Sequence, residues 1–463
     1  MIDFDPASFR DPSGRVFHHN NWVCRTLSVD AHRHFEAARA AGLIDSLVAD
    51  ELIVPSELVA AADLGLSASE ASEVVLKQPR VPLVTYSYEW SFEMLRDAAL
   101  VTLRVLDRAL ASGFILKDGN AFNILFDGTA PKLVDIPSIE PYREGAIWAG
   151  YGQFCRSFLF PLLLSAYHDV NIQALLRGTL GEVPVRDAAQ YLSLTDYLKP
   201  GVFKDVVLQA RLDRSFGAAA TTVQSATTGQ EYPKKALLAS VRRLTTIVSG
   251  LKPANRVSDW SNYETAHSYS ERDHSTKLIF VERVMAGRPP ARLVDLGCNT
   301  GEYSRIALRS ASFVISMDMD SRSVDRLYRG LSPRASLSLV VASLLNPTPA
   351  MGWRLQERSS LLDRFRCDGF LALALIHHLR ITGGVPLDAI LAQLFAIAPE
   401  GIVEWVDKDD AMVREMLSLR PDVYDDYTWP RFEAALRARG EIVAAQPTHD
   451  GRRRLCHVRA TRS

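Results

Sequence analysis

The chain has 463 residues, of which 47% are hydrophobic and 23% are charged, a composition typical of a globular protein rather than a disordered one. Its length predicts about three ordinary domains or two large ones. The 53 basic and 54 acidic residues give a net charge of −1, which argues against a general nucleic-acid binder and a polybasic membrane-surface protein. We therefore expect neither nucleic acid nor a membrane as a partner.

The five cysteines are scattered along the chain, and none forms a C-x-x-C pair. This pattern predicts neither a disulfide framework nor a structural zinc site. The start, Met1-Ile2-Asp3-Phe4-Asp5, shows no basic region or apolar run of a signal peptide. No apolar stretch approaches the roughly 20 residues that span a bilayer. A cytoplasmic protein without a bound metal is the expectation.

A small, polar stretch at 215–228 divides the chain, and a second loose stretch that contains Gly250 and Pro253 follows it. We expect one domain over 1–210, a linker over 211–260 that carries a helix near 234–249, and a second domain over 261–463.

In the first domain we expect a strand entered near Val16, a partner strand over 22–27, and helices over 31–49 and 91–112. After the second helix, Asp118 is followed by Asn123 and, beyond a short predicted hairpin, by Asp135. In protein kinases an Asp, an Asn five positions on and a later Asp form the catalytic and metal-binding set. The region therefore resembles the C-lobe of the kinase-like and aminoglycoside-phosphotransferase-like fold.

Several residues depart from the kinase pattern. Lys117 stands where an Arg precedes the catalytic Asp, and Ile-Pro rather than Phe-Gly follows Asp135. Only Lys77 and Lys117 precede Asp118 among the lysines, and no Gly-rich phosphate loop is found. These departures favour a degenerate α+β scaffold that binds the substrate or packs against the second domain. The alternative is a working phosphotransferase or nucleotide binder.

The second domain alternates apolar runs with helical patterns. Strands are expected at 292–296, 312–317, 337–342, 369–376 and 401–406, with helices at 303–309, 321–330, 386–397, 410–417 and 429–439. A final hairpin is expected over 441–460, around the turn His449-Asp450-Gly451. Such alternation predicts a mainly parallel, doubly wound α/β sheet with helices on both faces.

A turn with the sequence Asp295-Leu296-Gly297-Cys298-Asn299-Thr300-Gly301 follows the first of these strands. Glycine removes side chains where backbone approaches a ligand, and Asn299 stands where a middle glycine is expected because Asn tolerates positive φ. A dinucleotide fingerprint would need glycine at Asn299 and Glu302, and no Gly-Lys pair of a phosphate loop occurs. The spacing instead resembles the first motif of class I S-adenosyl-L-methionine (SAM) methyltransferases.

This resemblance implies a Rossmann-like, seven-stranded domain that binds SAM as its cofactor. It places Asp295 near the amino-acid moiety of SAM. It also places Gly297, Asn299 and Gly301 along the floor of the cofactor site.

Three further features fall in the order that the resemblance implies. Asp318 ends the second strand, where a carboxylate can accept both ribose hydroxyls, and Asp320 is a near competitor. Ser343 ends the third strand, where the family contacts adenine. His377 and His378 follow the fourth strand in a His-His-Leu sequence, and each is either a base that touches the substrate or a structural histidine.

Other charged and aromatic residues leave alternatives open. Glu404 lies inside an apolar strand, so it either faces the active site or pairs with an arginine. The charged runs 407–410 and 452–454 are interpreted as solvated loops. Aromatic side chains before the first strand either form a lid over the cofactor or belong to a helix that packs on the sheet: Trp260, Tyr263 and Tyr269.

We therefore predict a SAM-dependent methyltransferase that acts on an O or N nucleophile of a small-molecule or glycan-like acceptor, with His377 or His378 as the base. The alternatives are a bifunctional phosphotransferase and methyltransferase, and a non-catalytic ligand-binding scaffold. The whole layout resembles bacterial methyltransferase-like proteins, including the nodulation-protein NoeA-related family.

Overall fold

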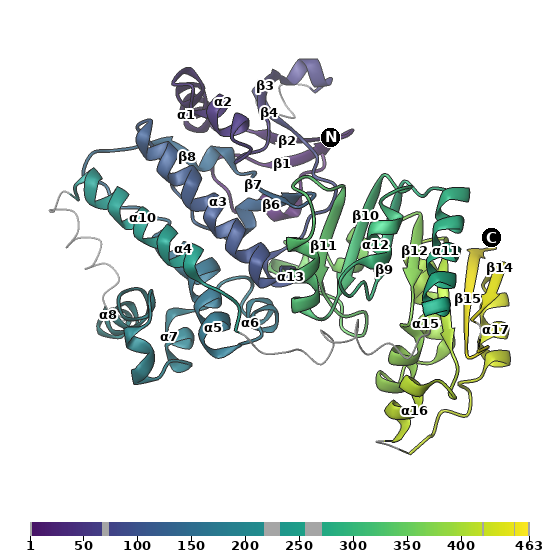
Figure 1. The fold of residues 1–463 in the computed structure, drawn as a ribbon. Helices are drawn as coiled ribbons and strands as arrows, with labels where there is room; N and C mark the ends of the chain where they lie inside the picture. Colours follow the sequence, from purple (N-terminus) through teal and green to yellow (C-terminus); the bar gives the residue numbers. More distant parts are fainter. Residues whose placement is uncertain are drawn as a thin grey trace. The chain divides into compact units, whose positions relative to one another are not determined.

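The computed structural model describes residues 2–66, 74–216, 232–254, 271–418, 421–448 and 450–461. The chain forms two compact units. In Figure 1 the colours follow the sequence, from purple at the N-terminus to yellow at the C-terminus. The first unit comprises 1–256 together with Ala350–Ser359, and the second comprises the rest. Within the described ranges, no helix is both long and apolar enough to cross a membrane.

The first unit begins with an antiparallel sheet in the order β1-β2-β4-β3. The expected strand pair near the start is confirmed as β1 and β2, and the four strands are β1 (Val16–His19), β2 (Trp22–Thr26), β3 (Glu57–Ala60) and β4 (Val74–Pro79). Phe17, Cys24 and Val75 are buried together against this sheet, so alternate positions of its strands form a small core.

The prediction of one continuous helix over 31–49 is wrong, because the segment forms two helices. Helix α1 (Val29–Ala40) is followed by α2 (Leu43–Ala49), and Gly42 between them has φ 72°. A left-handed residue cannot continue a right-handed helix, and glycine adopts that conformation at little cost.

The longest helix of the first unit is α3 (Phe92–Ala111), whose apolar face is buried, and α10 (Lys234–Gly250) packs along it (Figure 1). Strand β5 (Phe114–Leu116) pairs with β8 (Ile139–Pro141). The remaining described α-helices of this unit are α4 (Tyr151–Phe154), α5 (Phe160–His168), α6 (Ile172–Gly178), α7 (Val185–Gln190) and α8 (Leu208–Phe216).

A short hairpin separates the residues that carry the kinase resemblance. It consists of β6 (Ile124–Asp127) and β7 (Ala130–Leu133), which lie between Asn123 and Asp135. The predicted hairpin is therefore present, and it returns the chain so that both residues lie at its open end.

The second unit contains a seven-stranded sheet in the order β11-β10-β9-β12-β13-β15-β14. All neighbours are parallel except those of β15, which runs against both β13 and β14. The topology is that of the class I methyltransferase fold, and the predicted α/β, doubly wound fold is confirmed. The strands are β9 (Arg292–Leu296), β10 (Phe313–Asp318), β11 (Leu337–Val341), β12 (Gly369–Ala372), β13 (Glu400–Val406), β14 (Gly440–Pro447) and β15 (Arg453–Ala460).

Five helices lie at nearly the predicted positions: α12 (Glu302–Ala307), α13 (Ser321–Arg329), α15 (Leu387–Ile397), α16 (Ala411–Ser418) and α17 (Trp429–Arg437). Two others are α11 (Glu271–Gly287), before β9, and α14 (Leu361–Arg364), which has no counterpart among the predicted helices. The strand expected over 369–376 ends at Ala372, because Ala374 turns the chain with φ 50°. Trp260, Tyr263 and Tyr269, for which a lid and a helix packed on the sheet were both open, lie outside the described residues.

Candidate cofactor and active site

The Gly-rich turn after β9 is left-handed at three positions. Gly297, Asn299 and Gly301 have φ values of 77°, 49° and 79°. A Cβ on Gly301 would stand 2.4 Å from the side chain of Leu327, so glycine there lets α13 approach. The N–H of Gly297 donates to the carbonyl of Met317 at 2.8 Å, which ties the turn to the end of β10.

Asp318 ends β10, and each of its carboxylate oxygens accepts a backbone hydrogen bond, one of them from the Gly-rich turn. Oδ2 accepts from the N–H of Asn299 at 2.7 Å, and Oδ1 accepts from the N–H of Asp320 at 2.8 Å. A carboxylate has about four lone-pair sites, so each oxygen retains a site for a ribose hydroxyl. Asp320 instead caps α13, because its oxygens accept from the N–H of Arg322 and the hydroxyl of Ser323. The geometry therefore favours Asp318 over its competitor.

Asp295 lies near the carboxyl end of β9 and Ser343 follows β11, the two strands that flank β10, so both lie at the same edge of the sheet. Asp295 is 2% exposed, and burial raises its pKa to about 6, against the hydrogen bond that Ser304 donates at 2.6 Å. Ser316 donates in turn to Ser304 at 2.8 Å, so Asp295 anchors the start of α12 to the sheet. Ser343 is half-buried and accepts from the N–H of Leu345. Their contacts with SAM stay predictions.

His377 is fully buried, and within the described part of the chain neither ring nitrogen has a hydrogen-bond partner. Its ring centroid lies 4.2 Å from that of His378, which is partly exposed. Burial, together with the charges of nearby basic groups, lowers the pKa of His377 well below its usual value, and burial lowers the pKa of His378 to about 4. Both imidazoles are therefore neutral at pH 7, the state that accepts a proton.

Glu404 does not face solvent and is the centre of a buried charge network. Its Oε2 accepts from Lys277 Nζ at 2.6 Å and from the N–H of Ala374 at 2.8 Å, and its Oε1 accepts from Arg453 at 3.4 Å. Arg453 also binds Asp410 at 2.7 Å. The expectation that Asp410 and Arg453 are solvated is wrong, because each neutralises a buried partner. Glu404 fixes the left-handed turn that leads to His377.

The low histidine pKa values predict that acid destabilises the fold. An unfolded histidine binds a proton near pH 6.5, whereas folded His378 does so only near pH 4, so its stabilising contribution is lost as the pH falls between these values. One such group is worth roughly 3 kcal/mol over that window. The raised pKa of Asp295 acts in the opposite direction below about pH 6.

Urea unfolding of the wild type and of His378→Asn, measured between pH 7 and pH 4, checks this expectation. The variant should lose less stability than the wild type on acidification. Parallel curves would show that His378 does not titrate differently in the two states.

No family model matches the chain. Over 444 residues it is 35% identical to the nodulation protein NoeA of Rhizobium meliloti (strain 1021), an alignment that covers 94% of this chain and 92% of that protein. The chain belongs to the NoeA family.

Solved structures resemble part of the NoeA-family chain. Magnesium protoporphyrin IX methyltransferase (ChlM) from Synechocystis PCC 6803, with bound S-adenosylhomocysteine (SAH), is 15% identical, with 41% of this chain and 84% of that chain covered and a TM-score of 0.31. The N-methyltransferase NodS from Bradyrhizobium japonicum WM9 with SAH is 14% identical, with 44% and 94% covered and a TM-score of 0.30. The bifunctional kinase-methyltransferase WbdD is 16% identical, with 47% and 46% covered and a TM-score of 0.30.

The residues that carry the predicted kinase resemblance, Asp118, Asn123 and Asp135, come together in the first unit of the NoeA-family chain. Asn123 donates to Asp135 Oδ2 at 3.2 Å, and burial raises the pKa of Asp118, with the charge of Asp135 adding to the effect. Sequence reasoning missed Arg25 on β2, which donates to Asp135 Oδ1 at 2.5 Å and also pairs with Asp11. The sequence around Asp135 does not indicate that its partner is an arginine on a strand 110 positions earlier in the chain.

A segment of the chain that follows β11 packs on the first unit beside these residues. The guanidinium of Arg358 lies 4.0 Å from the ring centroid of Phe122, which precedes Asn123. Glu357, 7% exposed, accepts from Arg10 at 2.7 and 2.9 Å. This segment, Ala350–Ser359, belongs to the first unit although it lies within the predicted second domain over 261–463, and its position in the chain gives no sign of these contacts.

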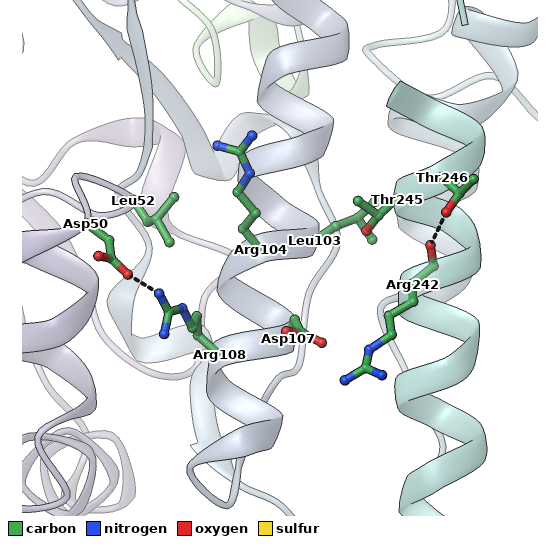
Figure 2. A pocket seen from close by; sticks show the side chains of 9 residues that line it. All are labelled: Asp50, Leu52, Leu103, Arg104, Asp107, Arg108, Arg242, Thr245 and Thr246. Atoms are coloured by element: carbon green, nitrogen blue, oxygen red, sulfur yellow. Dashed lines mark hydrogen bonds and ion pairs between the residues drawn. The ribbon is translucent and has the colours of Figure 1, made fainter. Parts of the chain in front are cut away.

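A separate cavity of about 600 Å³ opens between α3 and α10 of the first unit (Figure 2). Charged side chains dominate its lining: Arg104, Asp107 and Arg108 on α3, Arg242 on α10, and Asp50 after α2, which pairs with Arg108 at 2.7 Å. None of the residues predicted to bind the cofactor or to act as a base lines this cavity, so it is not the predicted active site.

Proposed function

We propose that the chain transfers the methyl group of SAM to an O or N nucleophile of a small-molecule or glycan-like acceptor. One juxtaposition carries this proposal: a left-handed Gly-rich turn, the carboxylate of Asp318 and the buried His377 follow three neighbouring parallel strands. The carboxyl ends of such strands form the ligand-binding edge of an open α/β sheet.

Residues of this edge fit SAM in residue type and placement. Asp318 would accept the ribose hydroxyls, and Gly297, Asn299 and Gly301 would present bare backbone to the cofactor. Ser343 and Asp295 would complete the site at the adenine and amino-acid ends. The imidazole of His377 is buried and has no hydrogen-bond partner among the described residues, which calls for a ligand or a water molecule.

SAM supplies an electrophilic methyl group, so the protein needs chiefly to align a nucleophile with it and to accept a proton. The proposal gives the proton to His377, which is neutral and buried. His378 packs against it, and Glu404 fixes the turn before it through the N–H of Ala374.

Three other functions would give different experimental results. A ligand sensor would bind SAM without turnover, and a scaffold would bind none. A bifunctional enzyme would also transfer phosphate, which the residues around Asp135 disfavour.

Asp318→Ala should weaken SAM binding by about tenfold or more. The variant loses charge-assisted hydrogen bonds of roughly 1.5–3 kcal/mol and also releases the N–H of Asn299 from its anchor. Isothermal titration calorimetry with SAM measures the change.

Asp320→Ala is the matched control, because it removes a carboxylate two residues away that caps α13. We expect it to lower stability and to leave SAM affinity within a few-fold of the wild type. Equal SAM affinities for the wild type and Asp318→Ala would contradict the proposal that Asp318 binds the ribose hydroxyls. Transfer of tritium from methyl-labelled SAM to a bacterial glycan and metabolite extract then separates an enzyme from a sensor.

A further inference from the structure

Asp135 corresponds to the carboxylate that binds the divalent cation in kinase-like folds, and here an arginine already binds it. Arg25 donates from Nη1 to Asp135 Oδ1 at 2.5 Å, and Asn123 donates to Oδ2 at 3.2 Å. The side chains of Arg25 and Asp135 are only 12% and 14% exposed. Solvent and salt therefore screen this pair weakly.

A divalent cation does not fit this arrangement. Mg²⁺ demands a near-octahedral shell of oxygen ligands at about 2.0–2.1 Å. The guanidinium of Arg25 stands on one oxygen of Asp135, and Asn123 presents its amide nitrogen rather than its oxygen to the other. A positive group at this distance repels a second cation.

Arg25 also binds the turn over residues 11–13, hereafter the N-terminal turn. Arg25 pairs with Asp11 as well as with Asp135, and Lys117, beside Asp118, donates to Ser13 at 2.6 Å. The N-terminal turn, β2 and the segment after β7 are thus joined by one ion-paired cluster. Removing Arg25 would leave two partly buried carboxylates without their shared counterion, and removing Asp135 would leave Arg25 with one of its two carboxylate partners.

We propose that Arg25 replaces the divalent cation of the kinase-like site, so that the first unit is a metal-independent, ion-paired scaffold and Asp135 is its anchor. This holds whether or not the second unit transfers methyl groups. It turns the motif formed by Asp118, Asn123 and Asp135 from a phosphotransfer centre into a structural cluster.

A matched pair of variants of the full chain tests the proposal by thermal unfolding. Asp118→Asn and Asp135→Asn each neutralise one carboxylate of the motif, but only Asp135 binds Arg25. Asp135→Asn should lower the unfolding midpoint by about 5 °C or more, with or without MgCl₂ and ATP. Asp118→Asn should leave it unchanged or raise it, because burial disfavours the charged form of Asp118. Equal midpoints for the two variants would overturn the proposal.

Titration of the wild type and of both variants with MnCl₂ in the presence of ATP, corrected for the heat of Mn²⁺ binding to ATP alone, is a second test. Absence of binding heat, or heat that Asp135→Asn leaves unchanged, supports the proposal. Heat that disappears in Asp135→Asn overturns it, as does magnesium-dependent ATP hydrolysis that disappears in Asp118→Asn. Arg25→Met removes the other member of the Arg25–Asp135 ion pair and should also lower the thermal unfolding midpoint. An unchanged unfolding midpoint would contradict the proposed role of Arg25.

Discussion

His377→Ala should lower methyl-transfer turnover by roughly 10²–10⁴-fold and leave SAM affinity unchanged, because the variant lacks the proposed base but keeps the cofactor edge. His378→Ala should chiefly lower stability, since His378 packs against His377. Turnover and calorimetric SAM affinity of both variants measure these effects. If neither variant loses more than a few-fold in turnover, neither histidine is the base. Methyl transfer would then rely on alignment of the acceptor without a base, or on Glu404 or a residue of the first unit as the base.

The pH dependence of turnover gives an independent check on the same residue. An unperturbed histidine base predicts a rate that rises with pH near about 6.5. Burial of His377 lowers its pKa well below that value, so the base is already neutral there. We therefore expect wild-type turnover to stay flat from pH 8 down to pH 6 and to fall only in stronger acid. A midpoint at pH 6.5 would place the base at an exposed histidine instead.

Glu404→Ala should lower the free energy of unfolding by about 3–5 kcal/mol, because it leaves two buried cations without their shared counterion. Glu404 is 1% exposed, and Lys277 and Arg453 are similarly enclosed. Urea unfolding of the full chain measures the loss. Glu433→Ala is the control, since Glu433 pairs with Arg437 at the surface and should cost less than about 1 kcal/mol.

A double variant distinguishes the ion pair from simple packing. Lys277→Met combined with Glu404→Leu replaces the buried pair by apolar groups of similar size and should cost less than the two single changes added together. Additive losses would mean that Lys277 and Glu404 do not interact energetically, against the 2.6 Å contact between them.

Local patterns predicted most of the second unit. Buried parallel strands are continuous apolar runs, and the spacing of Gly297, Asn299 and Gly301 marks a turn that needs positive φ. Local signals failed where a single residue interrupts a pattern. Gly42 ends α1, and Ala374 bends the chain away from β12 although the next residues are apolar.

Long-range pairing was beyond the reach of the sequence. Arg25 and Asp135 are 110 positions apart, yet they share one ion pair. Arg453 belongs to a run of arginines beside a turn, which is typical of a solvated loop, and its burial depends on Glu404 from a neighbouring strand. The identity of such a partner is set by strand order, not by the residues around the charge.

A crystal structure of the full chain with SAH would show whether the cofactor binds at the carboxyl ends of β9, β10 and β12. We expect the ligand along the turn that contains Gly297 and Asn299, with its ribose hydroxyls on Asp318 and its sulfur directed toward His377. The space beyond the sulfur would then define the size of the acceptor. A ligand bound elsewhere, or no bound ligand at saturating SAH, would contradict a SAM site at this edge of the sheet.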